Sequence, residues 1–249
     1  MNALHFPLPF RTPHSPVITG PDNLFALPEL EALLREELAT LAVRAARQPA
    51  GRALLLQACA ANRGLPVDTR HLGAIRGHVE RDALRGDVAC TTDALPWEDE
   101  AFQLVFAQHV GDVLPSSRAL IDELARVLAP GGVLLWCGLN PWSPWLAWIH
   151  WQARRGLPVP RVMHADIVRM RLLKRQLAPA GTDYLGTCWP QRSKRSAIGR
   201  SALLSPLRGA WLIAATKQRA VLTPLRPRAA RERVVIQPHL ATPSRRACA

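Results

Sequence analysis

The sequence predicts an α/β fold built on a parallel sheet, and the stretch from residue 93 to residue 140 carries this prediction. Residues 102–108 (FQLVFAQ) and 133–137 (VLLWC) are continuous apolar runs, which is typical of strands buried on both faces of a sheet. An amphipathic helix lies between them, and residues 130–132 (PGG) end it before the second strand. Parallel strands joined by a helix form a ligand cleft at their carboxyl ends, so this block also predicts where a site lies.

The helix of this block is expected to begin at Ser116 or Ser117, whose hydroxyl caps the first turn. Its inward face consists of Leu120, Ile121, Leu124, Val127 and Leu128. On its outer face, the spacing predicts ion pairs of Arg118 with Asp122 and of Asp122 with Arg126.

The segments before this block predict a helix and several strands. Residues 27–48 repeat apolar side chains with helical spacing and place glutamates early and arginines late, which suits the helix dipole. Residues 52–57 are a short apolar run and are expected to form the first buried strand. Residues 59–89 contain several glycines and arginines without a strong period, and short strands are expected near 74–79 and 88–92.

After the block, helices are predicted near residues 141–155 and over 164–177, and strands over 182–186 and 209–217. The first helix carries Trp142, Trp145, Trp148 and Trp151. At about 100° per residue, side chains at this spacing spread over roughly half the helix circumference, so some face the core and some face a cleft or solvent. A lid over an apolar substrate, a weak contact with a membrane surface and plain core packing are all left open.

Composition predicts one main domain with a basic tail. A chain of 249 residues that is 48% hydrophobic is large enough for one substantial core. We expect a proline-rich flexible extension over residues 1–22, a domain over 23–222 and a basic disordered tail over 223–249. The net charge of +13 raises the prospect of a nucleic-acid partner, but the tail has no interleaved aromatic residues for base stacking.

The cysteines and the N-terminal segment point to a reducing setting. The chain has 5 cysteines without a CxxC pair or a histidine at ligand spacing, which argues against a metal site and a disulfide framework. Residues 1–16 lack the features of a signal peptide, and no run approaches the length of a membrane span. A cytoplasmic monomer without a transmembrane segment is expected.

Four segments resemble the class I S-adenosylmethionine-dependent methyltransferase family, of the methyltransferase type 11 kind. Residues 93–102 (DALPWEDEAF) are similar to the family's ALPF-x-D-x-x-FD signature, and residues 123–132 (ELARVLAPGG) to its E-x-x-R-V-L-x-P-G-G helix end. Residues 138–145 (GLNPWSPW) resemble its G-F-N-P-x-S-x-W run, and residues 209–217 (GAWLIAATK) its last strand. The resemblance implies a three-layer Rossmann-like sheet, mostly parallel with an antiparallel last strand.

The resemblance also implies an activity and a set of cofactor contacts. It points to methyl transfer from S-adenosylmethionine to a small or lipid-like acceptor, with Leu95 beside the adenine and Asn140 toward the substrate. The residues that it places around the cofactor are Gln57, Ala58, Cys59, Thr91, Thr92, Asp93, Leu95, Gln108, His109 and Val110. It assigns no catalytic residue, and an aligned nucleophile and methyl group need no dedicated base.

The first half of the family's cofactor motif is divergent. Where the family has a glycine-rich turn after the first strand, this chain has Ala58 and Ala60, and Gln57 replaces an acidic residue. Each added methyl fills space where backbone and ligand approach closely. Thr91 takes the place of the acidic residue near the adenine. Acidic candidates for the ribose hydroxyls are Glu80 and Asp82.

Three functional interpretations remain. The first is a methyltransferase, the second a catalytically inactive protein of that fold that binds or scaffolds, and the third a basic nucleic-acid-associated protein. His109 follows a strand and has the chemistry of a general base, and Asp112 lies in the same loop, but a structural hydrogen bond is the favoured interpretation of both.

Overall fold

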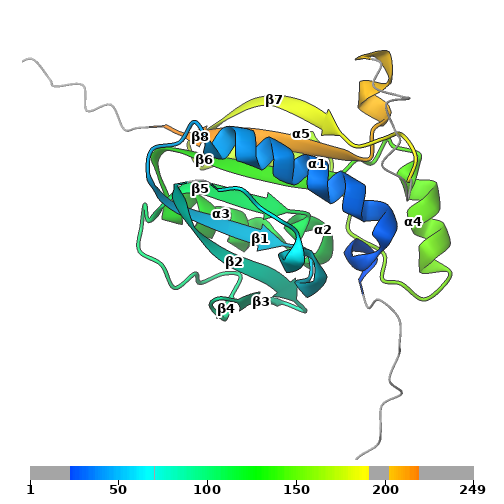
Figure 1. Cartoon of the computed structure of the whole chain (residues 1–249), viewed down its shortest axis with the longest axis horizontal. Coiled ribbons are helices and arrows are strands. Elements are labelled where there is room, and N and C mark those ends of the chain that lie inside the picture. The colour runs from blue at the N-terminus through cyan, green and yellow to red at the C-terminus, as the bar shows by residue number, and fades with distance from the viewer. Residues whose placement is uncertain (1–22, 70, 191–201, 219–249) are drawn as a thin grey trace, which may run out of the picture. The chain divides into compact units, whose positions relative to one another are not determined.

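The computed structural model describes residues 23–69, 71–190 and 202–218, all of which belong to one unit of the chain, Met1–Arg219. The expected extension over 1–22 and the tail over 223–249 lie outside the described residues, so the domain limits remain a prediction. In chain order the elements are η1 (Leu24–Ala26), α1 (Pro28–Ala45), β1 (Gly51–Gln57), η2 (Ala60–Gly64), β2 (Leu72–Glu80), β3 (Ala83–Gly86), β4 (Cys90–Thr91), β5 (Phe102–Gln108), α2 (Val110–Val113), α3 (Arg118–Val127), β6 (Leu128–Leu139), α4 (Trp145–Ala153), α5 (Ala165–Lys174), β7 (Leu177–Leu185), η3 (Ala202–Leu207) and β8 (Ala210–Lys217) (Figure 1).

The strands form one sheet in the order β4-β3-β2-β1-β5-β6-β8-β7. Its centre is parallel, because β1 pairs in parallel with both β2 and β5, and β5 with β6. The last strand, β8, runs antiparallel to both β6 and β7, which confirms the predicted fold class. The opposite edge adds something that the sequence did not predict. β3 and β4 pair antiparallel there, and the strand expected over 88–92 is reduced to two residues.

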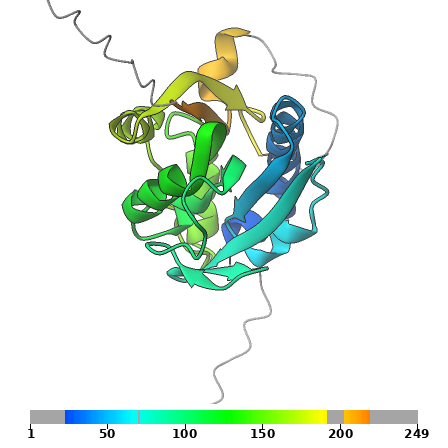
Figure 2. The ribbon, with the colours of Figure 1, turned by 90° about the vertical axis from the view of Figure 1, so that its left-hand side faces the viewer.

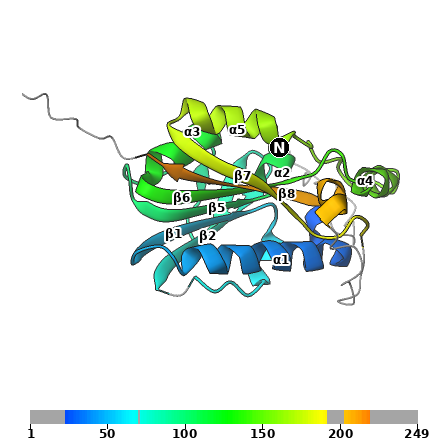
Figure 3. The ribbon, with the colours of Figure 1, turned by 90° about the horizontal axis from the view of Figure 1, so that it is seen from above.

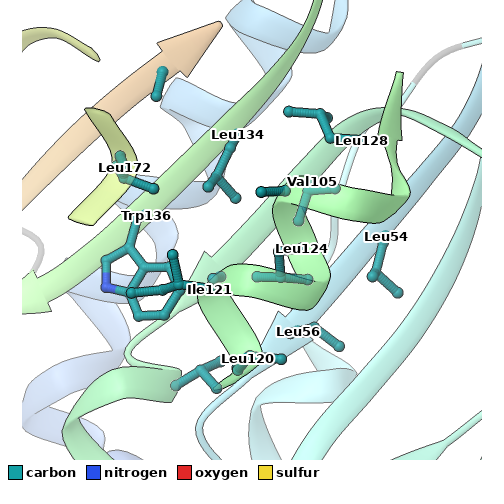
Figure 4. Close-up of a cluster of buried hydrophobic side chains, with 14 of the residues drawn as sticks. Leu54, Leu56, Val105, Leu120, Ile121, Leu124, Leu128, Leu134, Trp136 and Leu172 are labelled. Atoms are coloured by element: carbon teal, nitrogen blue, oxygen red, sulfur yellow. The ribbon is translucent and has the colours of Figure 1, made fainter. Parts of the chain in front are cut away.

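Helices cover both faces of the sheet. In Figures 2 and 3, α1 lies against one face, and α3 and α5 lie against the other, so the sheet is the middle of three layers. The side chains of β1 alternate between the two cores: Leu55 packs in the cluster beneath α1, and Leu54 and Leu56 in the cluster beneath α3. Figure 4 shows the second cluster, with Ile121 of α3 over Trp136 of β6. No helix in the described ranges is long and apolar enough to cross a membrane.

A third cluster of apolar side chains closes the end of the sheet where the parallel strands finish. It joins η1 and the start of α1 to α4, which Figure 3 shows beyond that end of the sheet. Trp145 and Trp148 of α4 are buried in this cluster, whereas Trp142 and Trp151 are exposed. The tryptophans therefore divide between core and solvent, as their spacing predicts.

Residues 130–132 (PGG) do not end the helix as predicted. α3 stops at Val127, Leu128 begins β6, and PGG lies within that strand. Gly131 has a φ of +82°, which favours glycine, and a Cβ on Gly132 would lie 2.8 Å from the carbonyl oxygen of Ala129. The pairing of β5 with β6 shifts register across these residues, since Phe102 pairs with Leu128 and the next partner of β5 is Val133.

The start of α3 differs from the expectation. Ser117 is the N-cap residue, but its side chain makes no capping hydrogen bond; its hydroxyl instead lies 3.8 Å from the sulfur of Met163. The predicted ion pairs along the outer face of α3 are also wrong. Asp122 pairs with Arg175 of α5, and Arg126 turns toward the segment before β5. Asp122 thus pairs with a residue of another helix, and Arg126 bonds both the segment before β5 and Glu123, three positions away on α3.

Arg126 fastens residues 93–99 to α3. Its guanidinium donates to the carbonyl oxygens of Leu95 (3.0 Å) and Trp97 (2.8 Å) and to the carboxylates of Asp99 and Glu123. Glu123 in turn accepts the backbone N–H of Leu95 at 2.9 Å. These bonds hold the pKa of Glu123 below its ordinary value, chiefly through the hydrogen bond from Arg126. The E-x-x-R spacing therefore serves to hold the loop.

We predict that Arg126→Met lowers the free energy of unfolding by about 1 to 2 kcal/mol, because charge-assisted bonds to two carbonyl groups are lost at a half-exposed site. Chemical denaturation measures this change. Arg118→Met, on an exposed position of the same helix, is the matched control and is expected to change stability by less than about 0.5 kcal/mol. Equal effects of the two substitutions would contradict the proposed role of Arg126.

Candidate functional site

A pocket of about 400 Å³ lies at the carboxyl ends of β1 and β2, where the parallel sheet predicts a cleft. Its volume is in the range of small-molecule sites. Its walls come from four segments: η1 and the residue before it, the residues after β1 and β2, α2, and the connection over residues 158–161. The backbone N–H of Arg161 donates to the carbonyl oxygen of Asp112 at 2.7 Å, which fastens that connection to α2.

The residues after β1 form one wall. Ala58 is fully buried and lines the pocket, and Cys59 continues in extended conformation into the short helix η2. Gln57 is buried and is bound to protein groups: its Nε2 donates to the carbonyl oxygen of Asn62 (3.0 Å) and to Oε1 of Gln108 (3.3 Å). An amide donor at this position is what the two acceptors require.

The segment before α1 covers this wall. Asn23 donates from Nδ2 to the carbonyl oxygen of Ala58 (3.4 Å) and accepts the backbone N–H of Phe25 (3.0 Å). The ring of Phe25 stacks on the imidazole of His109, with centroids 4.7 Å apart and an interplanar angle of 27°. Phe25 therefore lies between His109 and the pocket. Nothing in the periodicity of the sequence indicates these contacts, although Asn before an apolar pair is a common helix-cap pattern.

Beneath the pocket, His109 lies between two buried carboxylates. His109 has a φ of 55°, the left-handed region, so the chain turns sharply from β5 into α2. Its Nδ1 is 2.8 Å from Oδ2 of Asp112, and its Nε2 is 2.9 Å from Oε1 of Glu37 on α1. Gln108 adds a further bond, donating to Oε2 of Glu37 at 2.8 Å. The cluster thus joins α1, β5 and α2.

The charges of this cluster shift the pKa values of its members. Burial is the largest influence on His109 and by itself lowers the pKa of the imidazole. The charge of Glu37 and the hydrogen bonds with Asp112 and Glu37 outweigh it and raise the pKa of His109 to about 10. Burial raises the pKa of Asp112, and the hydrogen bond with His109 opposes that rise. His109 is accordingly an imidazolium at neutral pH, and both its nitrogens donate.

The carboxylate of Asp112 has one satisfied and one unsatisfied oxygen. Its Oδ2 accepts from His109 and from the backbone N–H of Leu139 at 2.9 Å. Its Oδ1 is buried and has no hydrogen-bond partner among the residues that the structure describes, and Asp112 is part of the pocket wall. A buried oxygen without a partner is costly to the folded state, so a donor supplied by a ligand would satisfy it.

Two arginines belong to the wall of the pocket. Arg81 occupies the turn between β2 and β3 with a φ of 56°, and Arg161 belongs to the connection before α5; both line the pocket. Arg161 also donates to the carbonyl oxygen of Pro115. Glu80, a ribose candidate, is exposed, with its carboxylate 3.6 Å from Nε of Arg85. Asp82, the other candidate, is exposed in the same turn.

The structure does not gather the predicted residues at this pocket. Of the predicted cofactor residues, all of which lie in the described ranges, Ala58 is the one that lines it. Thr91 belongs to β4 at the edge of the sheet, and Thr92 and Asp93 follow it. Leu95 and Val110 are buried in the core beneath α3. Their contact with a cofactor stays a prediction.

The sequence of residues 51–136 matches the family model described as a methyltransferase domain. Over 93 residues the chain is 36% identical to phthiotriol/phenolphthiotriol dimycocerosates methyltransferase 1 of Mycobacterium ulcerans (strain Agy99), covering 35% of this chain and 32% of that protein. Over 65 residues it is 37% identical to the chloroplastic tocopherol O-methyltransferase of Arabidopsis thaliana, covering 20% of this chain and 19% of that protein. The matches therefore span a third or less of these relatives.

Among solved structures, the chain is similar to a protein of Thermotoga maritima described as a SAM-dependent methyltransferase, possibly a histamine N-methyltransferase. That similarity covers 76% of this chain and 93% of the other, with 14% identity and a TM-score of 0.48.

The raised pKa of His109 predicts how stability changes with pH. Because the folded pKa is about 10 and the unfolded value is about 6.5, the folded protein holds one more proton between these values. The stabilisation is therefore complete below about pH 6.5 and is lost as the pH rises through about 10. In wild type, we expect the free energy of unfolding to fall from pH 7 to pH 10, by up to about 1.4 kcal/mol per pH unit.

The triple variant His109→Asn/Glu37→Gln/Asp112→Asn should remove that part of the pH dependence, since asparagine tolerates a positive φ at position 109 and none of the three new side chains titrates. All three groups are changed because either buried carboxylate left without the imidazolium would titrate in its place. Urea denaturation at several pH values measures the slope. His71→Asn, at an exposed histidine, is the control and should keep the wild-type slope. A slope that persists in the triple variant would show that the cluster is not its source.

We further predict that Gln57→Glu destabilises the protein, although an acidic residue is usual there in the family. The carboxylate would lose both donated hydrogen bonds and would face the carbonyl oxygen of Asn62 and Oε1 of Gln108. The expected loss is roughly 2 to 4 kcal/mol at neutral pH, and less in acid, where the carboxyl is protonated. Gln57→Met removes the bonds without adding charge and should cost less. If Gln57→Glu is as stable as wild type in denaturation, the amide is not needed.

Proposed function

We propose that the chain is a class I S-adenosylmethionine-dependent methyltransferase that transfers a methyl group from S-adenosylmethionine to a small or lipid-like acceptor, because residues 51–136 match the model of a methyltransferase domain. We place the cofactor in the pocket at the carboxyl ends of β1 and β2. The acceptor class follows from the relatives, one named for phthiotriol dimycocerosates and the other for tocopherol.

The observation that carries this proposal is the unsatisfied Oδ1 of Asp112. It is a buried acceptor in the wall of a pocket of small-molecule size. The methionine part of S-adenosylmethionine ends in an ammonium and a carboxylate. The ammonium is a donor for Asp112, and the guanidinium groups of Arg81 and Arg161 are of the kind that binds carboxylates. The pocket thus offers partners to both ends of a zwitterion.

The other residues of the pocket wall offer contacts for the adenine ring of the cofactor but no carboxylate for its ribose hydroxyls. Leu24, Phe25 and Val79 supply apolar surface for a ring. Ala58 has a methyl group where the family has glycine, and this residue is fully buried in the wall of the pocket. The expected carboxylate for the ribose does not fit this chain, because the pocket residue after β2 is Arg81. We therefore propose that this end of the cofactor is held mainly by apolar contact.

The protein's own contribution would be position and the exclusion of water. The bound cofactor supplies an electrophilic methyl group on a sulfonium. The residues of the pocket hold that methyl in line with the acceptor's nucleophile, which is sufficient for many such reactions. His109 is not proposed as a base, since it is buried as an imidazolium between two carboxylates and Phe25 covers its ring. Its role is to hold Asp112 in place.

Calorimetry with Asp112→Asn tests the proposal. Wild type should bind S-adenosylmethionine, and the variant should bind it about 10- to 100-fold more weakly, since a charge-assisted bond to the ammonium is lost. Methylthioadenosine, which lacks the amino-acid part, should bind both proteins equally. Asp183→Asn, which alters an exposed carboxylate of β7 outside the pocket wall, is the control and should bind like wild type.

Two outcomes would contradict the proposal. If wild type takes up no S-adenosylmethionine at roughly millimolar concentration, the domain is a non-catalytic member of its fold. If Asp112→Asn weakens both ligands equally while its thermal stability falls, Asp112 acts on the shape of the pocket and does not bind the ammonium.

A further inference from the structure

Helix α5 exposes an apolar stripe to solvent. Ile167, Met170 and Leu173 are 46%, 57% and 48% exposed, whereas Val168 and Leu172 on the opposite side are buried. At about 100° per residue, Met170 lies opposite the buried pair, and Ile167 and Leu173 lie about 60° to either side of it. Single exposed apolar residues are ordinary, but three on one face of a short helix point to a binding surface.

Basic side chains border this stripe. Arg169 and Arg171 lie at the two edges of the helix between its exposed and buried sides, and Lys174 follows Leu173. None of these three forms an ion pair with a carboxylate among the described residues, and Asp166 is the one acidic residue of the helix. Arg171 and Lys174 also line a groove of about 470 Å³ that α5 forms with α3. The surface around the stripe is therefore positively charged.

Two exposed tryptophans precede α5 in the chain. Trp142 is 70% exposed, and its ring packs edge-on against His164, the residue before α5, with centroids 5.7 Å apart. On α4, Trp151 is 46% exposed, and the guanidinium of Arg155 lies 3.7 Å from its ring centroid. Tryptophan beside arginine is typical of surfaces at the boundary between lipid and water.

We propose that this α5 face, comprising Trp142, Ile167, Met170 and Leu173 with Arg169 and Lys174, binds the surface of an anionic lipid bilayer. The apolar side chains enter the boundary between headgroups and acyl chains, and the arginine and lysine contact lipid phosphates. Charge complementarity selects this occupant, because a neutral apolar partner would not need the basic border. The contact does not require methyl transfer, so it goes beyond the proposed function.

The α5 face follows directly in the chain on the segment that lines the pocket. The connection between α4 and α5 supplies Val159 and Arg161 to the wall of the pocket and then leads to His164, where the stripe begins. Val159 is itself 56% exposed. An apolar acceptor that leaves the bilayer at the α5 face would therefore meet the pocket across a short path.

Vesicle sedimentation with the full chain tests this inference. Wild type should bind vesicles of phosphatidylcholine mixed with phosphatidylglycerol and bind pure phosphatidylcholine weakly. The variant Ile167→Ser/Met170→Ser/Leu173→Ser keeps the charge of the protein and should bind the anionic vesicles at least about 10-fold more weakly. Val43→Ser, an equally exposed apolar residue on α1, is the control and should bind like wild type.

A charge variant separates insertion from general attraction. Arg169→Glu/Lys174→Glu should also weaken binding at least about 10-fold, and more than Arg47→Glu/Arg52→Glu, which makes the same charge change at exposed positions elsewhere. If the serine variant binds like wild type, the net charge of +13 alone attracts the vesicles and the proposal fails. It also fails if sedimentation shows that the serine substitutions convert a dimer to a monomer, because the stripe is then a protein interface.

Discussion

The structure depends on one imidazolium held between two carboxylates in the interior. His109 and Glu37 have no exposed side-chain surface, and Asp112 has 1%. Buried charges are tolerated only when partners satisfy them, so each of these groups needs the other two. Glu37 comes from α1, and Asp112 also accepts the N–H of Leu139 at the end of β6. The cluster therefore fixes α1 and the ends of the central strands in one arrangement.

Asp112 belongs both to this cluster and to the wall of the pocket. The hydrogen bonds of the cluster therefore also hold this part of the pocket wall in place. One oxygen of Asp112 is committed to His109 and Leu139, which leaves the other oriented by the fold and not by a ligand. The ring of Phe25 stacks on the imidazole of His109 and covers it. A ligand that donates to Oδ1 would bind to a group already in position, which reduces the ordering cost of binding.

The sequence predicts the central strands well because they are continuous apolar runs, and α1 and α3 because their apolar residues recur with a helical period. It predicts the β3–β4 edge poorly, since residues 83–91 show no clear period and Leu84 is the one buried residue among them. The site could not be predicted because its contacts join distant segments: His109 meets Glu37, 72 positions away, and Ala58 meets Asn23, 35 positions away. The sequence indicates Asp112 as a partner of His109, but only the three-dimensional structure shows that its Oδ1 has no hydrogen-bond partner among the described residues.

The alanines after β1 are best understood together with the buried amide of Gln57 that precedes them. Gln57 donates to the carbonyl oxygen of Asn62 in η2 and to Gln108, which donates to Glu37. A glycine-rich turn would leave such backbone groups free to meet a ligand, whereas here they are bound within the protein and covered by Asn23. Recognition then has to come from side chains on other segments. In the proposed cofactor site, the side chains that offer such polar contacts are Asp112 and the arginines at positions 81 and 161, which come from α2, the turn after β2 and the connection before α5.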